Sequence, residues 1–428
     1  MMIRQLILLC TAILTIVSTF AQEELGAKKD SVKKMMLYPP SIDPETGLMD
    51  SASLANARIY TSLSTALKNK DRVHKFQLAY IDDLRSIPEK LFELEKLQVL
   101  EIRFLPRLAS IPPEIAKLKN LEQLYVNETA IVTVPKEIAE LPRLRVLNLS
   151  QNKIAKLPSE IGDCPELEQL ALFANNLYAL PPELSKLKKL KSLEVHDNKL
   201  SIMAKEICSI SSLEWLDFSY NALRTLPKEI KELKNLKGLV LSRNRILYLP
   251  SEMKYLQNLE WLDLSVNVLR TFEDALLELQ NLKVLGLSGN MIPVLPPDID
   301  LLSNLESLDI TLKKEGPLTP QIGNLKKLKW LNLTNCNLTE LPKELGKLEN
   351  LHTLYMSKNK LKYLPEEISN LQNLKILDLN FNTLEDLPSS IWKLGMLKIL
   401  SITNNPAVPS SRVEELHNLL PKNCDVIY

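Results

Sequence analysis

Aromatic and acidic side chains recur at fixed intervals along this chain, where they could bind another molecule. Trp215, Trp261 and Trp330 are separated by multiples of 23 residues, and Asp217 and Asp263 follow two of them by two positions. Exposed tryptophan is a frequent anchor for a protein partner. A carboxylate beside it could receive a lysine or arginine of that partner. This spacing therefore indicates a binding surface.

Residues suited to catalysis do not form a comparable pattern. The sequence contains none of the motifs G-x-x-x-x-G-K-[ST], G-x-S-x-G, H-E-x-x-H or C-x-x-C, and its 4 histidines are scattered. The net charge is +1, which gives no electrostatic case for nucleic-acid binding. We expect no catalytic residue, no cofactor, no metal site and no nucleic-acid partner, and we predict that the protein is not an enzyme.

The elements that position these side chains belong to a repeat of 23 residues. One unit reads Leu144-x-x-Leu147-x-Leu149-x-x-Asn152-x-Ile154-x-x-Leu157-Pro158, and further units follow to Leu397. Upstream, units begin at Leu97 and Leu121 and a weaker one at Val73, which makes about 15 units in all. The chain therefore reads as one long array rather than several globular domains.

The unit predicts a strand, a turn and a short helical segment. Leucines two residues apart lie on the same face of a strand, and the residues between them point outward. Asparagine at the ninth position can bond the backbone of the turn. A Pro-x-Glu sequence such as Pro135-Lys136-Glu137 suits the first helical turn, with proline at the first helical position. Strands stack more closely than helices, so the array should curve with its sheet on the concave face.

This pattern resembles the leucine-rich repeat family, and the L-P-x-E-I-x-x-L ending is similar to its Ras-group scaffolds. The resemblance covers about four-fifths of the chain. It implies an α/β fold: a leucine-rich repeat solenoid, a curved horseshoe with a parallel β-sheet on the concave face and short helices or turns on the convex face. With its N-terminal segment, the chain resembles secreted leucine-rich repeat proteins of Gram-negative bacteria.

Third, fifth and eighth positions of the units should face the concavity. The candidate partner-binding residues are Trp215, Asp217, Tyr220, Arg243, Trp261, Asp263, Trp330 and Tyr355. Two other interpretations stay open. Large side chains could merely pack across strands, and L-D-L-S is a common sequence in the family. The unit with Lys313, Glu315 and Gly316-Pro317 breaks the pattern, either as a loop shaped for a partner or as drift.

The termini predict export and two caps. Residues 1–21 read as a signal peptide, with Arg4 before an apolar run, and residues 22–50 as a flexible leader. Residues 51–72 should form an N-terminal capping helix, 73–409 the array and 410–428 a C-terminal cap, opened by a capping box at Ser411 and Glu414. Cysteines are few and far apart, so we expect no disulfide framework.

These observations support two hypotheses of function. The first is a non-enzymatic scaffold, exported to the periplasm or the exterior, that binds a protein or peptide partner on its concave face. The alternative is a glycan-binding or envelope-associated structural protein. After signal removal we expect no membrane span, and we expect a monomer.

Overall fold

The computed structural model describes residues 42, 43 and 45–428, and the predicted signal peptide lies outside them. The chain divides into a short unit that ends at Arg58 and a large unit from Ile59 to Tyr428. Within the described part of the short unit, Ile42 and Met49 form an antiparallel bridge. Helix α2 (Ser51–Ala55) follows, capped by the Asp50 carboxylate. The bridge between Ile42 and Met49 lies within residues 22–50, the segment predicted as a flexible leader.

The large unit contains one parallel sheet in which each strand pairs with the next along the chain. The Leu-x-Leu spacing places one leucine of each unit on the same buried line, so that Leu216, Leu239 and Leu262 stand in register with no exposed surface. The strands are β1 (Ile59–Tyr60), β2 (Lys75–Ala79), β3 (Val99–Leu105), β4 (Gln123–Thr129), β5 (Val146–Asn148), β6 (Gln169–Ala171), β7 (Ser192–Glu194), β8 (Trp215–Asp217), β9 (Gly238–Val240), β10 (Trp261–Asp263), β11 (Val284–Leu287), β12 (Ser307–Ile310), β13 (Trp330–Asn332), β14 (Thr353–Tyr355), β15 (Ile376–Asp378), β16 (Ile399–Ser401) and β17 (Asp425–Ile427).

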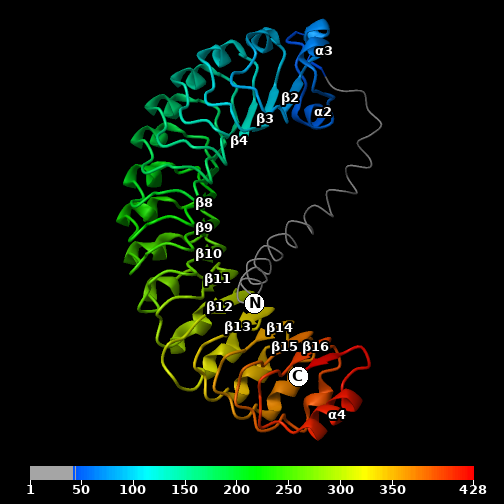
Figure 1. Cartoon of the computed structure of the whole chain (residues 1–428). Helices are drawn as coiled ribbons and strands as arrows, with labels where there is room; N and C mark the ends of the chain where they lie inside the picture. Colours follow the sequence, from blue (N-terminus) through cyan, green and yellow to red (C-terminus); the bar gives the residue numbers. More distant parts are fainter. Residues whose placement is uncertain (1–41, 44) are drawn as a thin grey trace. The chain divides into compact units, whose positions relative to one another are not determined.

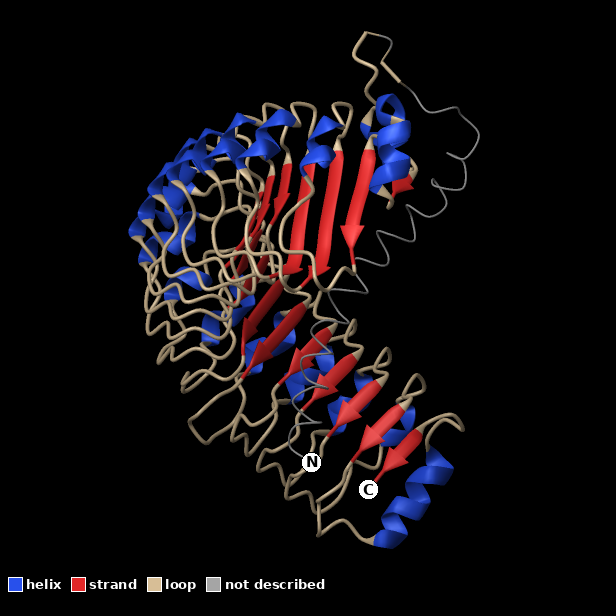
Figure 2. Cartoon of the chain, turned by 45° about the horizontal axis from the view of Figure 1, so that its top comes forward, coloured by secondary structure: helices blue, strands red, loops and turns tan. Residues whose placement is uncertain are grey.

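Short 3-10 helices return the chain from each strand to the next. Figure 1 shows these helices on the outer side of the curved large unit and the strands on its inner side, and Figure 2 shows the strands lying side by side. The helices are η2 (Lys70–Arg72), η3 (Glu89–Glu93), η4 (Pro113–Lys117), η5 (Lys136–Glu140), η6 (Ser159–Asp163), η7 (Pro182–Lys186), η8 (Lys205–Ser209), η9 (Lys228–Glu232), η10 (Ser251–Tyr255), η11 (Asp274–Leu276), η12 (Pro297–Leu301), η13 (Pro320–Asn324), η14 (Lys343–Lys347), η15 (Glu366–Asn370) and η16 (Ile391–Lys393).

The proline of the repeat occupies the N-cap rather than the first helical position that we predicted. Pro135 has φ −71° and ψ 144°, and its carbonyl accepts a hydrogen bond from the Ile138 amide at 3.2 Å. The residue before a helix has an extended backbone while its carbonyl already accepts the first helical bond. Proline satisfies both conditions, because its φ is fixed and it has a carbonyl but no N–H. Glu137 lies in the first turn, as predicted.

Two asparagine ladders hold successive turns together. The predicted ladder uses the ninth position: the Asn244 amide nitrogen donates to Phe218 O at 2.9 Å, and its oxygen accepts from the Leu223 amide at 2.9 Å. A second ladder, which sequence reasoning missed, uses the asparagine before the first leucine of a unit. Asn258 Nδ2 donates to Lys234 O at 2.7 Å, and Asn235, Asn281, Asn304, Asn350 and Asn373 make the equivalent bond.

The N-terminal end of the large unit differs from the single capping helix that we predicted. Residues 59–72 contain β1, which pairs in parallel with β2, followed by α3 (Leu63–Lys68) and η2. Ser62 caps α3, and its hydroxyl accepts from the Thr65 amide. Ile59, expected on the apolar face of a helix, is 44% exposed in the edge strand instead. A strand satisfies the hydrogen-bonding groups of β2, which a helix laid against the leucine core would leave open.

The C-terminal end also contains a strand that we did not predict. Helix α4 (Ser410–Leu419) buries Val413, Leu416 and Leu420 as expected, and β17 then pairs with β16. The predicted capping box does not form, because the N-cap is Pro409, two residues before Ser411. No helix of the described residues has the length and apolar character needed to cross a membrane.

Candidate functional site

The structure brings two of the predicted tryptophans together. Trp215 and Trp261 begin β8 and β10, and the strand between them carries Gly238 in the same register. Their ring centroids are 6.4 Å apart and tilted by 52°. Both side chains are half-buried, so each ring keeps a face toward the concave side. Such tilted pairs are a favourable arrangement of aromatic rings.

Gly238 makes this contact possible, and sequence reasoning missed it. A Cβ atom at this position would lie 2.1 Å from Cε3 of Trp215, because the ring lies over the backbone of β9. Glycine inside a strand weakens it and often marks a close approach by another group. The glycine inside a predicted strand was therefore the sequence signal that another group approaches the backbone here. Trp215, Gly238 and Trp261 thus form an aromatic floor across three strands.

Trp330 lies in a different place from the other two tryptophans. It begins β13, three strands beyond β10, and its ring contacts Tyr355 of β14 edge-on at 6.0 Å. The structure therefore divides the predicted aromatic residues into two clusters on the same sheet face. One cluster is the floor over β8–β10, and the other is the pair Trp330 and Tyr355.

Tyr220 and Arg243 form a third contact at the edge of the sheet. Both occupy eighth positions and have positive φ, 51° and 55°. The Arg243 guanidinium lies 4.8 Å from the centroid of the Tyr220 ring, within the range of a cation–π interaction. Side chains at the eighth positions of neighbouring units can therefore contact one another. Tyr80 and Phe104 also occupy eighth positions with positive φ, and their rings stack with centroids 4.7 Å apart.

Asp217 and Asp263 each brace the loop that follows their strand. Asp217 Oδ1 accepts from the Ser219 amide at 2.8 Å and from its hydroxyl at 2.7 Å. Asp263 Oδ1 accepts from the Ser265 amide at 2.9 Å. The L-D-L-S sequence therefore has a structural role in this chain. The second oxygen of Asp217 lies near His196, and both side chains are partly exposed.

His196, from the unit before Asp217, lies beside the Asp217 carboxylate. His196 stacks on Phe173 with ring centroids 4.5 Å apart, and its Nδ1 lies 3.2 Å from Asp217 Oδ2. Burial lowers the pKa of His196, but the carboxylates of Asp217 and Glu194 outweigh burial and raise it overall. The sequence placed His196 at an outward position without linking it to Asp217.

Asp309, two strands beyond Asp263 in the same row, is only 6% exposed. It accepts hydrogen bonds from the Ser288 hydroxyl at 2.7 Å and from the Asn332 amide at 2.9 Å. Burial raises the pKa of Asp309 to about 6. This residue is therefore part of the sheet's packing, whereas Asp217 and Asp263 are partly exposed.

The second position of the units carries a row of alternating charge that sequence reasoning missed. From Glu122 to Lys329 the sign changes at every unit. The structure forms ion pairs along this row: Arg145–Glu168 at 2.7 Å, Lys191–Glu168 at 3.0 Å, Lys237–Glu214 at 2.7 Å, Lys283–Glu260 at 2.7 Å and Lys329–Glu306 at 2.7 Å. The opposite charges of this row therefore neutralise one another. Their 23-residue spacing in the sequence could have revealed these ion pairs.

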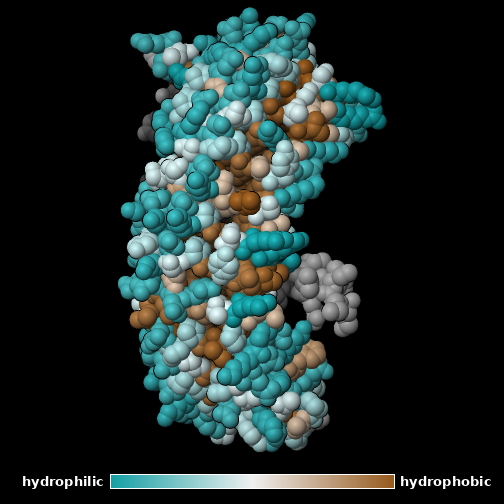
Figure 3. All heavy atoms as spheres, turned by 90° about the vertical axis from the view of Figure 1, so that its left-hand side faces the viewer, coloured by the Kyte–Doolittle hydropathy of each residue, from teal (hydrophilic) through white to brown (hydrophobic). Residues whose placement is uncertain are grey.

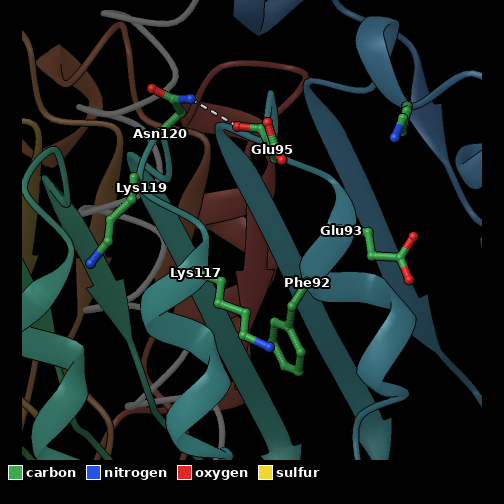
Figure 4. A pocket seen from close by; sticks show the side chains of 7 residues that line it. Phe92, Glu93, Glu95, Lys117, Lys119 and Asn120 are labelled. Atoms are coloured by element: carbon green, nitrogen blue, oxygen red, sulfur yellow. Dashed lines mark hydrogen bonds between the residues drawn. The ribbon is translucent and has the colours of Figure 1, made fainter.

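Two pockets lie away from these concave-face residues. One, of about 450 Å³, is lined by Lys70, Phe92, Glu93, Glu95, Lys117, Lys119 and Asn120. Figure 4 shows the Lys117 ammonium beside the Phe92 ring, and Asn120 donates to Glu95 O at 2.8 Å. The bond from Asn120 belongs to the second asparagine ladder, and the other lining side chains are of mixed charge.

The other pocket, of about 290 Å³, lies at the irregular unit. Leu312 and Leu318 are buried there, with 4% and 2% of their surface exposed. They supply apolar packing in a unit where Glu315 stands at the usual apolar position. Glu315 instead forms an ion pair with Lys360, two units further on. Cys336 donates its thiol to Ile310 O at 3.2 Å where asparagine would stand.

The described part of the chain has His, Cys, Asp and Glu side chains, the groups that a metal site or a reactive thiol requires. No three or more His, Cys, Asp or Glu side chains there converge to hold a metal ion. Cys164, Cys208 and Cys336 are buried free thiols, and burial raises the pKa of each to about 12. A thiol with such a pKa is not a nucleophile at neutral pH.

Comparisons with known proteins agree with this repeat architecture. A family model described as "Leucine rich repeat" matches residues 95–154, 165–223, 189–246, 234–292 and 326–384. The chain belongs to the leucine-rich repeat family. None of the curated protein sequences is similar enough to this leucine-rich repeat protein to count as a relative.

Solved structures of leucine-rich repeat proteins resemble this one over most of its length. A leucine-rich repeat protein of Leptospira interrogans is 34% identical with a TM-score of 0.81, covering 87% of this chain and 100% of its own. The plant peptide hormone receptor RGFR1 in complex with RGF2 is 26% identical with a TM-score of 0.65, covering 82% of this chain and 57% of its own. An internalin of Listeria monocytogenes is 25% identical with a TM-score of 0.64, covering 73% and 88%.

Proposed function

We propose that this protein is an exported, non-enzymatic scaffold that binds a protein or peptide partner on its concave face. The observation that carries the proposal is the aromatic floor over β8–β10, where the half-buried rings of Trp215 and Trp261 meet above Gly238. Aromatic side chains held on a rigid sheet lose little entropy on binding and are the usual anchors of interfaces.

The family gives further support to an interaction function. Leucine-rich repeat proteins are typically protein-interaction scaffolds, and the similar plant receptor was solved with a peptide hormone bound. The clusters at Trp215–Trp261 and Trp330–Tyr355 lie on one sheet face, so a single extended or folded partner can contact both. The N-terminal sequence and the bacterial relatives support export to the periplasm or the exterior.

A pull-down tests this proposal. Immobilised wild-type protein is incubated with native envelope extract, beside the variant Trp215→Ala plus Trp261→Ala. The matched control is Trp392→Ala, which removes a tryptophan that is 52% exposed on η16, outside the sheet. All three proteins must first melt at similar temperatures. We expect the double variant to lose its partner, by roughly 2 kcal/mol or more of binding free energy, and the control to keep it.

The outcome also separates the alternative function. Recovery of a cell-wall glycan that depends on Trp215 and Trp261 would favour a glycan-binding or envelope-associated structural protein, because aromatic rings also stack on sugars. If the double variant retains the partner with unchanged affinity, the concave-face assignment is wrong.

A further inference from the structure

The concave side of the array carries two rows of charge, and only one is neutralised. In the second-position row, each Glu from Glu168 to Glu306 is paired with a Lys or Arg of a neighbouring unit, as at Glu214–Lys237 and Glu260–Lys283. In the fifth-position row, Asp217 contacts His196 and Ser219, and Asp263 contacts Ser265. Among the described residues, neither acid has a Lys or Arg partner. Asp217 and Asp263 are therefore not neutralised by a Lys or Arg as the acids of the other row are.

The pairs Trp215/Asp217 and Trp261/Asp263 repeat on alternate strands. The strand between them, β9, carries Gly238 and Val240 at the same two positions and so offers no charge. Adjacent strands are ~4.8 Å apart, so equivalent atoms of β8 and β10 are separated by ~9.6 Å. The backbones of two aromatic–acidic subsites are thus ~9.6 Å apart, while their rings lean together over Gly238 with centroids 6.4 Å apart.

We infer that this surface binds an extended protein segment that carries Lys or Arg at every third residue. A polyproline II segment rises ~3.1 Å per residue and has three residues per turn, so such side chains recur on one face every ~9.3 Å. That period matches the separation of the two strands that carry Asp217 and Asp263. The inference rests on the proposed function, because it specifies the partner of the same concave surface.

Each subsite suits the two ends of a basic side chain. The alkyl stem and charged head can lie against the ring of Trp215 or Trp261, which attracts cations through its face. The head then reaches the carboxylate of Asp217 or Asp263 on the same strand. The Trp215 ring covers Gly238. Val240, between the two acids, carries no charge and faces the small uncharged residues of the segment.

Three labelled peptides of identical composition test the spacing. Each has a Pro/Gly background and two arginines, placed at i and i+3, at i and i+1, or at i and i+5. Binding to the full chain is followed by fluorescence anisotropy. We expect the i, i+3 peptide to bind about tenfold more tightly than the other two. Its affinity should fall as salt rises, because the contacts are ionic.

Variants locate the binding to the two subsites. Asp263→Asn and Trp261→Ala should each abolish the preference for i, i+3, and Gly238→Ala should weaken it by displacing the Trp215 ring. Asp378→Asn, a matched change in the same row on β15, should leave it intact. Thermal melts establish that the variants are folded.

Equal affinity for the three peptides, absence of binding at millimolar concentration, or an unchanged preference in Asp263→Asn would overturn the inference. These outcomes differ from a failure of the proposed function. If the envelope partner still depends on Trp215 and Trp261 while the peptides show no spacing preference, the concave face remains the binding surface and only the partner class is wrong.

Discussion

Neighbouring residues of a strand in this protein have opposite energetic roles. In β9, Leu239 has no exposed surface, while Val240 is partly exposed on the concave side. The eighth position shows a different effect, because its backbone has positive φ in nearly every unit whatever residue stands there. The position of a residue in the repeat therefore decides whether it packs in the core, faces the concave side or has a strained backbone.

Replacement of Leu239 by alanine should lower the free energy of unfolding by roughly 2–5 kcal/mol, through lost transfer energy and a cavity. Val240→Ala should cost well under that, because part of its side chain already contacts solvent. Denaturant melts of both variants measure the difference. Equal losses would mean that the two strand faces are assigned the wrong way round.

Val266 is a site of backbone strain, because a β-branched residue has φ 55° there. Its side chain is 44% exposed, so little burial is lost on replacement. Val266→Asn should raise the free energy of unfolding by about 1 kcal/mol, since asparagine tolerates this conformation. The reciprocal change, Asn335→Val at φ 61°, should destabilise by a similar amount. Thermal melts measure both, and stabilisation by Asn335→Val would contradict the explanation.

The buried carboxyl of Asp309 predicts a pH dependence. Burial raises its pKa from 3.8 to about 6, so the folded state holds this proton more tightly than the unfolded state. Its contribution to stability is present below pH 4 and is lost as the pH rises through 6. Asp309→Asn should therefore stabilise the protein at pH 8 by roughly 1–3 kcal/mol and have little effect at pH 4. Denaturant melts at the two pH values compare variant with wild type; equal effects would contradict the assignment.

At the scale of the element, each unit is a strand, a turn and a 3-10 helix joined to its neighbours by side-chain ladders. Most ninth-position asparagines are buried, and Asn244 bonds backbone groups of two units. The second ladder lies on the surface, where Asn258 makes one bond. The alternating ion pairs add a third ladder. Each of these pairs is partly exposed and contributes little by itself.

The two asparagine ladders should differ in strength. Asn244→Ala leaves the buried Leu223 amide and Phe218 carbonyl without partners, and it should cost roughly 2–4 kcal/mol. Asn258→Ala removes one exposed bond to Lys234 O and should cost at most about 1 kcal/mol. Chemical denaturation of the two variants makes the comparison. A larger loss for Asn258→Ala would show that the surface ladder carries the stability.

At the scale of the large unit, one apolar core runs from β2 to β17 without interruption. Figure 3 views the molecule from the side of the 3-10 helices and shows polar groups over most of that face, with apolar groups between them. In a repeat array each unit contacts mainly its neighbours, so the ends must be covered by units with a polar outer side. Here α4 and β17 cover the C-terminal end, where Arg412 also pairs with Asp386 at 3.0 Å.

Removal of residues 410–428 should expose the last leucine row and lower the stability of the C-terminal units. Leu416 and Leu420 are 0% and 5% exposed in the intact chain and pack on this row. We expect earlier melting and concentration-dependent aggregation, measured by calorimetry and light scattering. The variant Leu416→Ala keeps the chain length and should cost roughly 2–5 kcal/mol. A truncated protein that melts like wild type would show that the cap is dispensable.

The repeat, its strand faces and its parallel sheet could be predicted from the sequence because they depend on local spacing: leucines two residues apart share a face, and units of equal length place them in register. The same rule predicted the outward position of Trp215, Asp217, Trp261 and Asp263. Gly238, the His196–Asp217 contact and the burial of Asp309 could not, because each depends on how far a side chain extends over the next strand.

The ends of the array show the same limit. Residues 51–72 have helical apolar spacing, but the open edge of β2 needs hydrogen-bonding partners, and β1 supplies them. Likewise β17 forms because β16 presents an unpaired edge beyond the last repeat. Periodicity along the chain describes what a segment can form by itself. The tertiary structure decides its conformation where neighbouring backbone groups must be satisfied, since an unpaired buried N–H or C=O costs more than a local preference contributes.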